Sequence, residues 1–162
     1  MTKRQTHTVK IAGLTRELPL FEVAPGLRIA IFNMLGDTEI VQVAAKALTK
    51  RLPKEAQSLV TAEAKSIPLC YAMSVESKLP YAVLRKSYKP YMGDAVSAET
   101  LSITTGQPQT LYLDEKDRAL IDGKQVVLVD DVISTGSTLQ GMRLIIEKAG
   151  GQIVATTAVF TE

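Results

Sequence analysis

Two aspartates and a short run of hydroxyl residues have types and spacing that suit the binding of a phosphorylated sugar. Asp130 and Asp131 precede the segment 134–138, whose sequence is Ser-Thr-Gly-Ser-Thr. Glycine lets the backbone approach a ligand closely, and the N–H groups at a helix start bind phosphate. Carboxylates accept hydrogen bonds from sugar hydroxyls and can lie near a divalent metal ion. A ribose 5-phosphate group would satisfy both halves of this pattern.

The residues around the pattern predict a strand before it and a helix after it. The segment 126–129 is a β-branched and aliphatic run, typical of a strand buried on both faces. Open parallel sheets bind ligands outside the carboxyl ends of their strands, so the pattern lies where a site is expected. The alternative is a plain strand-to-helix connection with a solvated acidic pair. Apolar residues then recur at helical spacing, namely Leu139, Met142, Ile145, Ile146 and Ala149.

The stretch from Val126 to Leu139 resembles the phosphoribosyl pyrophosphate-binding motif of the type I phosphoribosyltransferases, a hydrophobic strand followed by Asp-Asp and then Thr-Gly-x-Thr. The resemblance implies that Asp130 and Asp131 are catalytic and fix the ribose. It also implies Mg²⁺ as a cofactor that the donor carries, near the two aspartates, with no ligand assigned from the protein. The 5-phosphate would bind to Ser134, Thr135, Gly136, Ser137 and Thr138.

Two further segments resemble the pyrophosphate-binding parts of the purine members of this family. The first is Thr-Ala-Glu-Ala-Lys-Ser at 61–66, in which the family often has a cis peptide bond without proline. The second is the Arg-Lys pair that follows the expected strand 81–84. Solvated lysines are the alternative for Lys65 and Lys89. The resemblance implies pyrophosphate binding by Glu63, Ala64, Lys65, Ser66, Arg85, Lys86 and Lys89.

Three segments are expected to lie around the site. The segment 18–33 contains a Pro-Gly turn and resembles the hood over the base in adenine phosphoribosyltransferases, although a hairpin that only covers the core fits equally well. The segment 87–98 has no apolar period, which predicts a long mobile loop that closes over the leaving group. Residues 1–16 show little periodicity and predict a solvated arm, with His7 as an exposed bystander.

One position departs from the adenine enzymes. They carry Tyr-x-Leu-Glu-Tyr-Gly, whose Glu is assigned to proton transfer at the base. In the nearest match here, Thr104 stands at the position of that Glu.

The expected function is transfer of ribose 5-phosphate from phosphoribosyl pyrophosphate to a purine, of the adenine type by resemblance, giving a nucleoside monophosphate and pyrophosphate in purine salvage. The alternatives are a 6-oxopurine specificity (hypoxanthine, guanine or xanthine) and a regulator that binds the donor without catalysis. A pyrimidine enzyme of the same superfamily is disfavoured by the segments at 61–65 and 85–86.

Length and composition set the remaining expectations. A chain of 162 residues predicts one domain over 1–162, with 1–34 as arm and hood. The expected fold is α/β, a doubly wound and mostly parallel sheet of about five strands with an antiparallel hairpin at the flexible loop. The net charge of +2 is too mild to indicate nucleic acid, and one cysteine fits a reducing compartment. No signal peptide or membrane span is present in the sequence, so we expect a cytoplasmic protein, a homodimer by resemblance.

Overall fold

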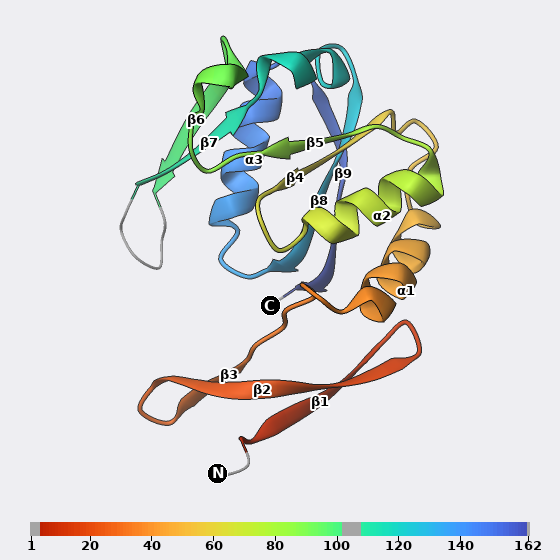
Figure 1. Cartoon of the computed structure of the whole chain (residues 1–162), viewed down its shortest axis with the longest axis vertical. Coiled ribbons are helices and arrows are strands. Elements are labelled where there is room, and N and C mark those ends of the chain that lie inside the picture. The colour runs from red at the N-terminus through yellow and green to blue at the C-terminus, as the bar shows by residue number, and fades with distance from the viewer. Residues whose placement is uncertain (1–3, 102–107, 162) are drawn as a thin grey trace.

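A parallel sheet forms the centre of the computed structural model, which describes residues 4–101 and 108–161 (Figure 1). The strand order is β5-β4-β8-β9, and every neighbouring pair in it is parallel. The α/β class and the parallel sheet are confirmed, although this sheet has four strands where about five were expected. The strands are β4 (Ser58–Ala62), β5 (Tyr81–Leu84), β8 (Gln125–Ile133) and β9 (Gln152–Thr161).

Helices cover both faces of this sheet, which confirms the doubly wound arrangement. Helices α1 (Thr38–Thr49) and α2 (Ile67–Ser77) lie on one face, and α3 (Ser137–Lys148) lies on the other (Figure 1). Successive side chains of β8 point to opposite faces of the sheet, so this strand packs against the helices on both sides. Val127 and Val129 are buried in the core that contains α1 and α2, whereas Val126 and Leu128 are buried with α3.

The predicted antiparallel hairpin is present beside β5. Strands β6 (Val96–Leu101) and β7 (Pro108–Leu113) pair with each other, and an antiparallel bridge between Arg85 and Tyr112 joins β7 to the end of β5. The backbone N–H of each of these two residues donates to the carbonyl of the other at 2.9 Å. Two short 3-10 helices, η1 (Pro90–Met92) and η2 (Glu115–Leu120), flank the hairpin.

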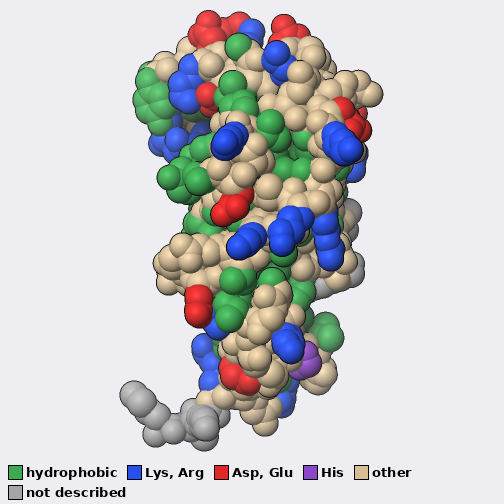
Figure 2. Space-filling view, turned by 90° about the vertical axis from the view of Figure 1, so that its right-hand side faces the viewer, with side chains coloured by type: hydrophobic (Ala, Val, Ile, Leu, Met, Phe, Trp, Pro, Cys, Tyr) green, Lys and Arg blue, Asp and Glu red, His purple; other side chains and the backbone are tan. Residues whose placement is uncertain are grey.

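The N-terminal residues form a separate antiparallel sheet, the hood, made of β1 (Thr6–Ile11), β2 (Leu14–Ala24) and β3 (Leu27–Ala30). The prediction of a solvated arm over 1–16 is therefore wrong for most of that segment. The cause is the tight turn at Ala12 and Gly13, whose φ angles of 47° and 93° are those that hairpin turns favour. The hood is the narrow lower part of the molecule in Figure 2.

The hood is attached to the parallel sheet by apolar packing and by one arginine. Ile11, Leu18 and Phe32 are buried in the same core as α1 and α2, and the ring of Phe32 meets that of Phe160 edge to face at 5.0 Å. From β2, Arg16 Nε donates to Asp37 Oδ2 at 2.7 Å. The same arginine donates to Glu39 at 2.8 Å. Asp37 also caps α1 by accepting from the N–H of Ile40, so the arginine ties the hood to a helix start.

Replacing Arg16 with methionine is expected to loosen the hood while the parallel sheet stays intact. The change keeps the apolar stem but removes the donors to Asp37 and Glu39. Backbone amides of β1 and β2 should then exchange with deuterium faster, and those of β8 should not. Arg28→Met is the matched control, because Arg28 pairs at 3.9 Å with Glu22 inside the hood itself. Equal exchange in both variants would contradict this role for Arg16.

None of the helices in the described part of the chain combines the length and the apolar composition that a membrane crossing requires.

Candidate active site

The central strand is longer than predicted and contains both aspartates. β8 continues to Ile133 because β9 keeps pairing with it up to Ile133 and Thr161, whereas β4 stops pairing at Leu128. Asp130 and Asp131 therefore lie within a strand, not after one. Their side chains differ in surroundings: Asp130 lines a pocket at the carboxyl end of the sheet, and Asp131 is only 8% exposed.

The predicted hydroxyl run encloses this first pocket, which we call the turn pocket. Its volume is about 270 Å³, and Gln109 of β7 and Asp130 complete its walls. Gly136 precedes α3 with a φ of +77°, and a Cβ built on it would meet nothing within 4 Å. The backbone at the helix start is therefore open to a ligand, which suits a phosphate. The predicted residues that line the pocket together are Ser134, Thr135, Gly136, Ser137 and Thr138.

A buried chain of hydroxyl groups holds Asp130 in place. Its Oδ1 accepts a hydrogen bond from Ser66 Oγ at 3.2 Å and one from the N–H of Asp131 at 2.9 Å. Ser66 Oγ in turn accepts from Thr61 Oγ1 at 2.9 Å, and both hydroxyl residues are buried. Ser66 was predicted to bind pyrophosphate, but its hydroxyl is directed at the aspartate. The sequence analysis missed Thr61, which has no signal beyond its place at a strand end.

Burial, followed by the neighbouring Asp131, raises the pKa of Asp130 from 3.8 to about 6. A carboxyl group with a raised pKa stabilises the fold fully below its unfolded pKa, and that contribution is lost as the pH rises through the folded value. We therefore expect Asp130→Asn to gain stability relative to the wild type as the pH rises from about 4 to about 7. Thermal unfolding without donor measures this, with Asp122→Asn on the exposed turn before β8 as control. A gain that does not depend on pH would contradict it.

The two predicted pyrophosphate segments contact each other at the ends of β4 and β5. Glu63 Oε2 lies 2.5 Å from Arg85 Nε, and Glu63 Oε1 accepts from the N–H of Lys86 at 2.6 Å. Burial alone would raise the pKa of Glu63, but the Lys86 amide and Arg85 outweigh it and lower the pKa. Glu63 is thus an anion that orients Arg85, and the Glu63–Ala64 peptide bond is cis.

The predicted cations surround this junction with their side chains in solvent. Lys65, Lys86 and Lys89 are all exposed, and Ala64 beside Lys65 is exposed as well. Lys65 lines a second pocket, which shares Ser134 with the hydroxyl run. Lys65 follows β4 and Lys86 follows β5, so both lie at the carboxyl ends of neighbouring strands, whereas the loop that contains Lys89 packs through Asp94 against Arg118 of η2.

The segment 87–98, for which the lack of an apolar period predicted a mobile loop, contains buried apolar side chains. Met92 is 1% exposed, and Ala98 is buried in the core with α3. The backbone N–H of Lys89 lies 3.3 Å from the sulfur of Met92, which folds the segment into η1. A single buried methionine follows no strand or helix period, so pattern analysis does not detect it.

A second pocket lies between the hood and the ends of β8 and β9, and we call it the hood pocket. Its volume is about 410 Å³, and hood residues, Lys65 and the ends of both strands line it. Val132 and Ser134 line both the hood pocket and the turn pocket, so the two pockets adjoin, and we refer to them together as the cleft. The other apolar residues of the hood pocket are Val9, Leu18, Ile29, Ala30, Ile31, Phe32 and Phe160.

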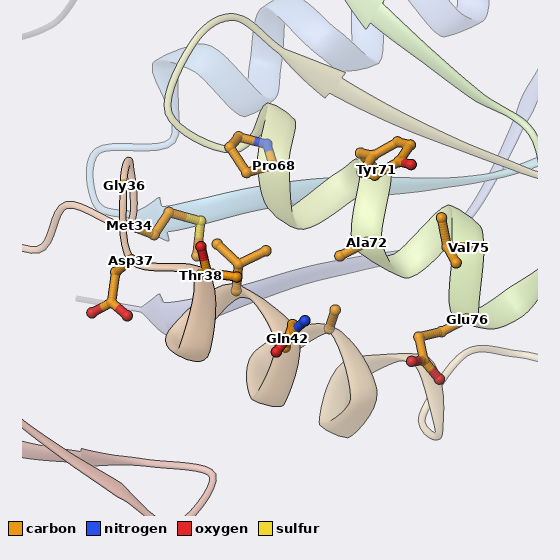
Figure 3. Close-up of a pocket in the computed structure, with 12 residues that line it drawn as sticks. Met34, Gly36, Asp37, Thr38, Gln42, Pro68, Tyr71, Ala72, Val75 and Glu76 are labelled. Carbon is orange, nitrogen blue, oxygen red and sulfur yellow. The ribbon is translucent and has the colours of Figure 1, made fainter.

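A third concavity, of about 390 Å³, separates α1 from α2 and is not part of this cleft (Figure 3). Tyr71, Ala72 and Val75 of α2 face Thr38 and Gln42 of α1 across it (Figure 3). Tyr71 is 56% exposed. The groove carries no cluster of cations or hydroxyl groups, so it does not suit a phosphate.

Position 104 lies outside the described residues, so the structure does not place Thr104, the residue predicted to stand at the general acid of the adenine enzymes.

The chain has a parallel α/β sheet, and a glycine-containing hydroxyl turn at the carboxyl end of its central strand lines a pocket of the kind that suits a phosphate. Comparison with known proteins identifies the family. Residues 34–162 match the family described as phosphoribosyl transferase domain. The chain therefore belongs to the phosphoribosyltransferase family.

Relatives with curated names share about a third of the aligned residues. The hypoxanthine/guanine phosphoribosyltransferase of Methanococcus voltae is 32% identical over 122 residues, covering 75% of this chain and 62% of that protein. The protein of the same name from Methanocaldococcus vulcanius is 35% identical over 95 residues, covering 59% of this chain and 48% of that protein. The chain thus spans about 60% of the length of the Methanococcus relatives that it matches.

Solved structures share the fold at lower sequence identity. The adenine phosphoribosyltransferase of Saccharomyces cerevisiae, solved with adenine, has a TM-score of 0.75 and 17% identity, covering 90% of this chain and 84% of that chain. The adenine phosphoribosyltransferase of Rhodothermus marinus has a TM-score of 0.69 and 21% identity, covering 97% and 82%.

Proposed function

We propose that this chain transfers ribose 5-phosphate from phosphoribosyl pyrophosphate to a purine base, which makes it a pentosyltransferase of purine salvage. One observation carries the proposal: a polar pocket and a largely apolar pocket share Val132 and Ser134. The 5-phosphate occupies the turn pocket, and the base occupies the hood pocket. The ribose then lies between them, beside Asp130.

The chemistry follows from the charges around the ribose. Asp130 accepts hydrogen bonds from the ribose hydroxyls, and the buried Asp131 behind it offsets the positive charge that develops on the sugar as pyrophosphate leaves. Lys86 and Lys89 neutralise the pyrophosphate, as does Arg85, which Glu63 orients at 2.5 Å, whereas Lys65 lines the pocket of the base. The protein thus acts by positioning the two reactants and stabilising charge.

Magnesium fits this site as an ion that the donor carries. No cluster of three or more acidic, histidine or cysteine side chains that could hold a metal occurs within 4–101 and 108–161. Asp130 and Asp131 alone cannot complete the six oxygen ligands that Mg²⁺ prefers, so donor oxygens and water would supply the others. The bound ion would neutralise charge on the pyrophosphate and hold its geometry.

Two classes of purine are candidates. Adenine is the first, because the hood and the segment after β5 resemble those of adenine enzymes. The second is a 6-oxopurine, which Lys65 favours because an ammonium group only donates hydrogen bonds. The ammonium group of Lys65 would donate to the carbonyl oxygen at position 6 of hypoxanthine, guanine or xanthine, whereas adenine has an amino group at that position. The curated relatives named above carry the name hypoxanthine/guanine phosphoribosyltransferase.

A parallel assay distinguishes these candidates. Phosphoribosyl pyrophosphate and Mg²⁺ are incubated with adenine, hypoxanthine, guanine or xanthine, and the nucleotide product is measured for each. We expect turnover with at least one base, and a Lys65→Met variant should lose more activity with 6-oxopurines than with adenine. Donor binding without turnover of any base would contradict the enzyme and favour a regulator that senses the donor.

The homodimer, the cytoplasmic location and the single domain over 1–162 stay predictions. Light scattering of the purified protein tests the first of them.

A further inference from the structure

If a purine reacts in the hood pocket, a group in that pocket has to accept a proton from the purine. A neutral purine carries one proton on its imidazole ring. As N9 bonds to C1′ of the ribose, the bond from C1′ to the pyrophosphate oxygen breaks and its electron pair leaves with pyrophosphate. The ring proton must then pass to a base, and a positioned general base accelerates this step. The question is which side chain of the pocket can accept it.

Few of the side chains that line this pocket can exchange protons. Among the described lining residues, His7 and Lys65 are the titratable ones. A lysine ammonium has no lone pair to accept a proton, and serine and threonine hydroxyls are too weakly basic. An imidazole accepts and releases protons near neutral pH. His7 is therefore the side chain in the pocket whose chemistry suits the step.

The strand pattern of the hood directs His7 toward the cleft. In β1 the residues Thr6 and Thr8 point to the other side, where both hydroxyls donate to the carboxylate of Glu17 at 2.8 and 2.6 Å. His7 pairs across the sheet with Leu18, which is buried against the main core. Because side chains alternate along a strand, His7 lies on the same face as that buried leucine. The only histidine of the chain thus lies over the cleft.

We propose that His7 accepts the proton from the ring nitrogen of the purine as the N-glycosidic bond forms. The assignment rests on the proposed function and adds the residue that removes the proton. His7 becomes imidazolium and the base becomes the neutral nucleobase of the product. Since His7 is exposed, its proton then passes to water.

The test replaces His7 with glutamine and with alanine and measures steady-state kinetics with the preferred base. We expect His7→Gln to lower kcat about 30-fold, below the usual effect of a general base because the pocket is open to water. Its affinity for phosphoribosyl pyrophosphate, measured by calorimetry, should not change. Free imidazole should restore activity to His7→Ala, because the pocket is open to solvent. Thr6→Val, on the opposite face of the same strand, is the matched control.

Each outcome decides between the two proposals. A kcat of His7→Gln within about threefold of the wild type, or no rescue of His7→Ala by imidazole, would overturn the role of His7 and leave the proposed function standing. A raised KM for the base with an unchanged kcat would make His7 a binding residue and also overturn the proton role. A wild type without turnover of any purine would overturn the proposed function and this inference with it.

Discussion

Replacing Gly136 with valine is expected to weaken the binding of phosphoribosyl pyrophosphate by about 10³-fold, the scale set by losing several backbone contacts to a phosphate. The Cβ position of Gly136 is empty within 4 Å and belongs to the wall of the turn pocket. A valine there would occupy the space in which the 5-phosphate approaches the start of α3. Calorimetry with donor and Mg²⁺ measures the affinity directly.

The control for this variant is a valine at another glycine with a positive φ, outside the turn pocket. Gly123 has a φ of +68° and an equally empty Cβ position, and it lies on the turn before β8. Gly123→Val should therefore lose stability, because β-branched residues avoid positive φ, but should bind the donor normally. If both variants bind the donor as the wild type does, the 5-phosphate does not lie in the turn pocket.

Replacing Asp131 with asparagine is expected to lower kcat on the order of 10²-fold, with a smaller change in donor affinity. The two side chains have nearly the same shape, so the variant removes charge and little else. Positive charge develops on the ribose only as pyrophosphate leaves, so the lost carboxylate matters more in the transition state than in the bound donor. Steady-state kinetics and calorimetry on the same preparation separate the two effects.

A second buried aspartate provides the control. Asp114 is also 8% exposed, and its carboxylate caps η2 by accepting from the N–H of Lys116 at 3.0 Å. Asp114→Asn should lose some stability and keep its kcat. A similar loss of kcat in both variants would mean that general destabilisation, not charge at the ribose, causes the effect.

The local pattern around residues 126–139 was sufficient to predict the strand, the turn and the helix that surround the candidate site. A buried strand, an acidic pair, a glycine among hydroxyl residues and a helix follow each other without interruption, and the structure places the run 134–138 around one pocket. The helix predicted from the spacing of Leu139, Met142, Ile145 and Ile146 is also present, as α3. These features depend on residues close in sequence, which is why periodicity and capping preferences detect them.

The features that the sequence analysis missed depend on distant residues. The length of β8 is set by its pairing with β9, and no residue of β8 alone signals it. The hydrogen bond from Ser66 to Asp130 joins positions 64 residues apart. His7 was dismissed because it has no metal ligand at the usual spacing, yet the alternation in β1 would have indicated a strand. Its position over the cleft follows from packing that only the structure contains.

The family match begins at residue 34, after the last hood strand, while His7 and most of the other residues that line the hood pocket precede it. Under the proposed function, the pocket for the acceptor base is therefore assembled from two consecutive stretches of the chain, because Lys65 and the ends of β8 and β9 complete its wall. A chimera with the hood of a relative, joined at Phe32, should change the acceptor preference only as far as the hood sets it, and the contribution of Lys65 should persist.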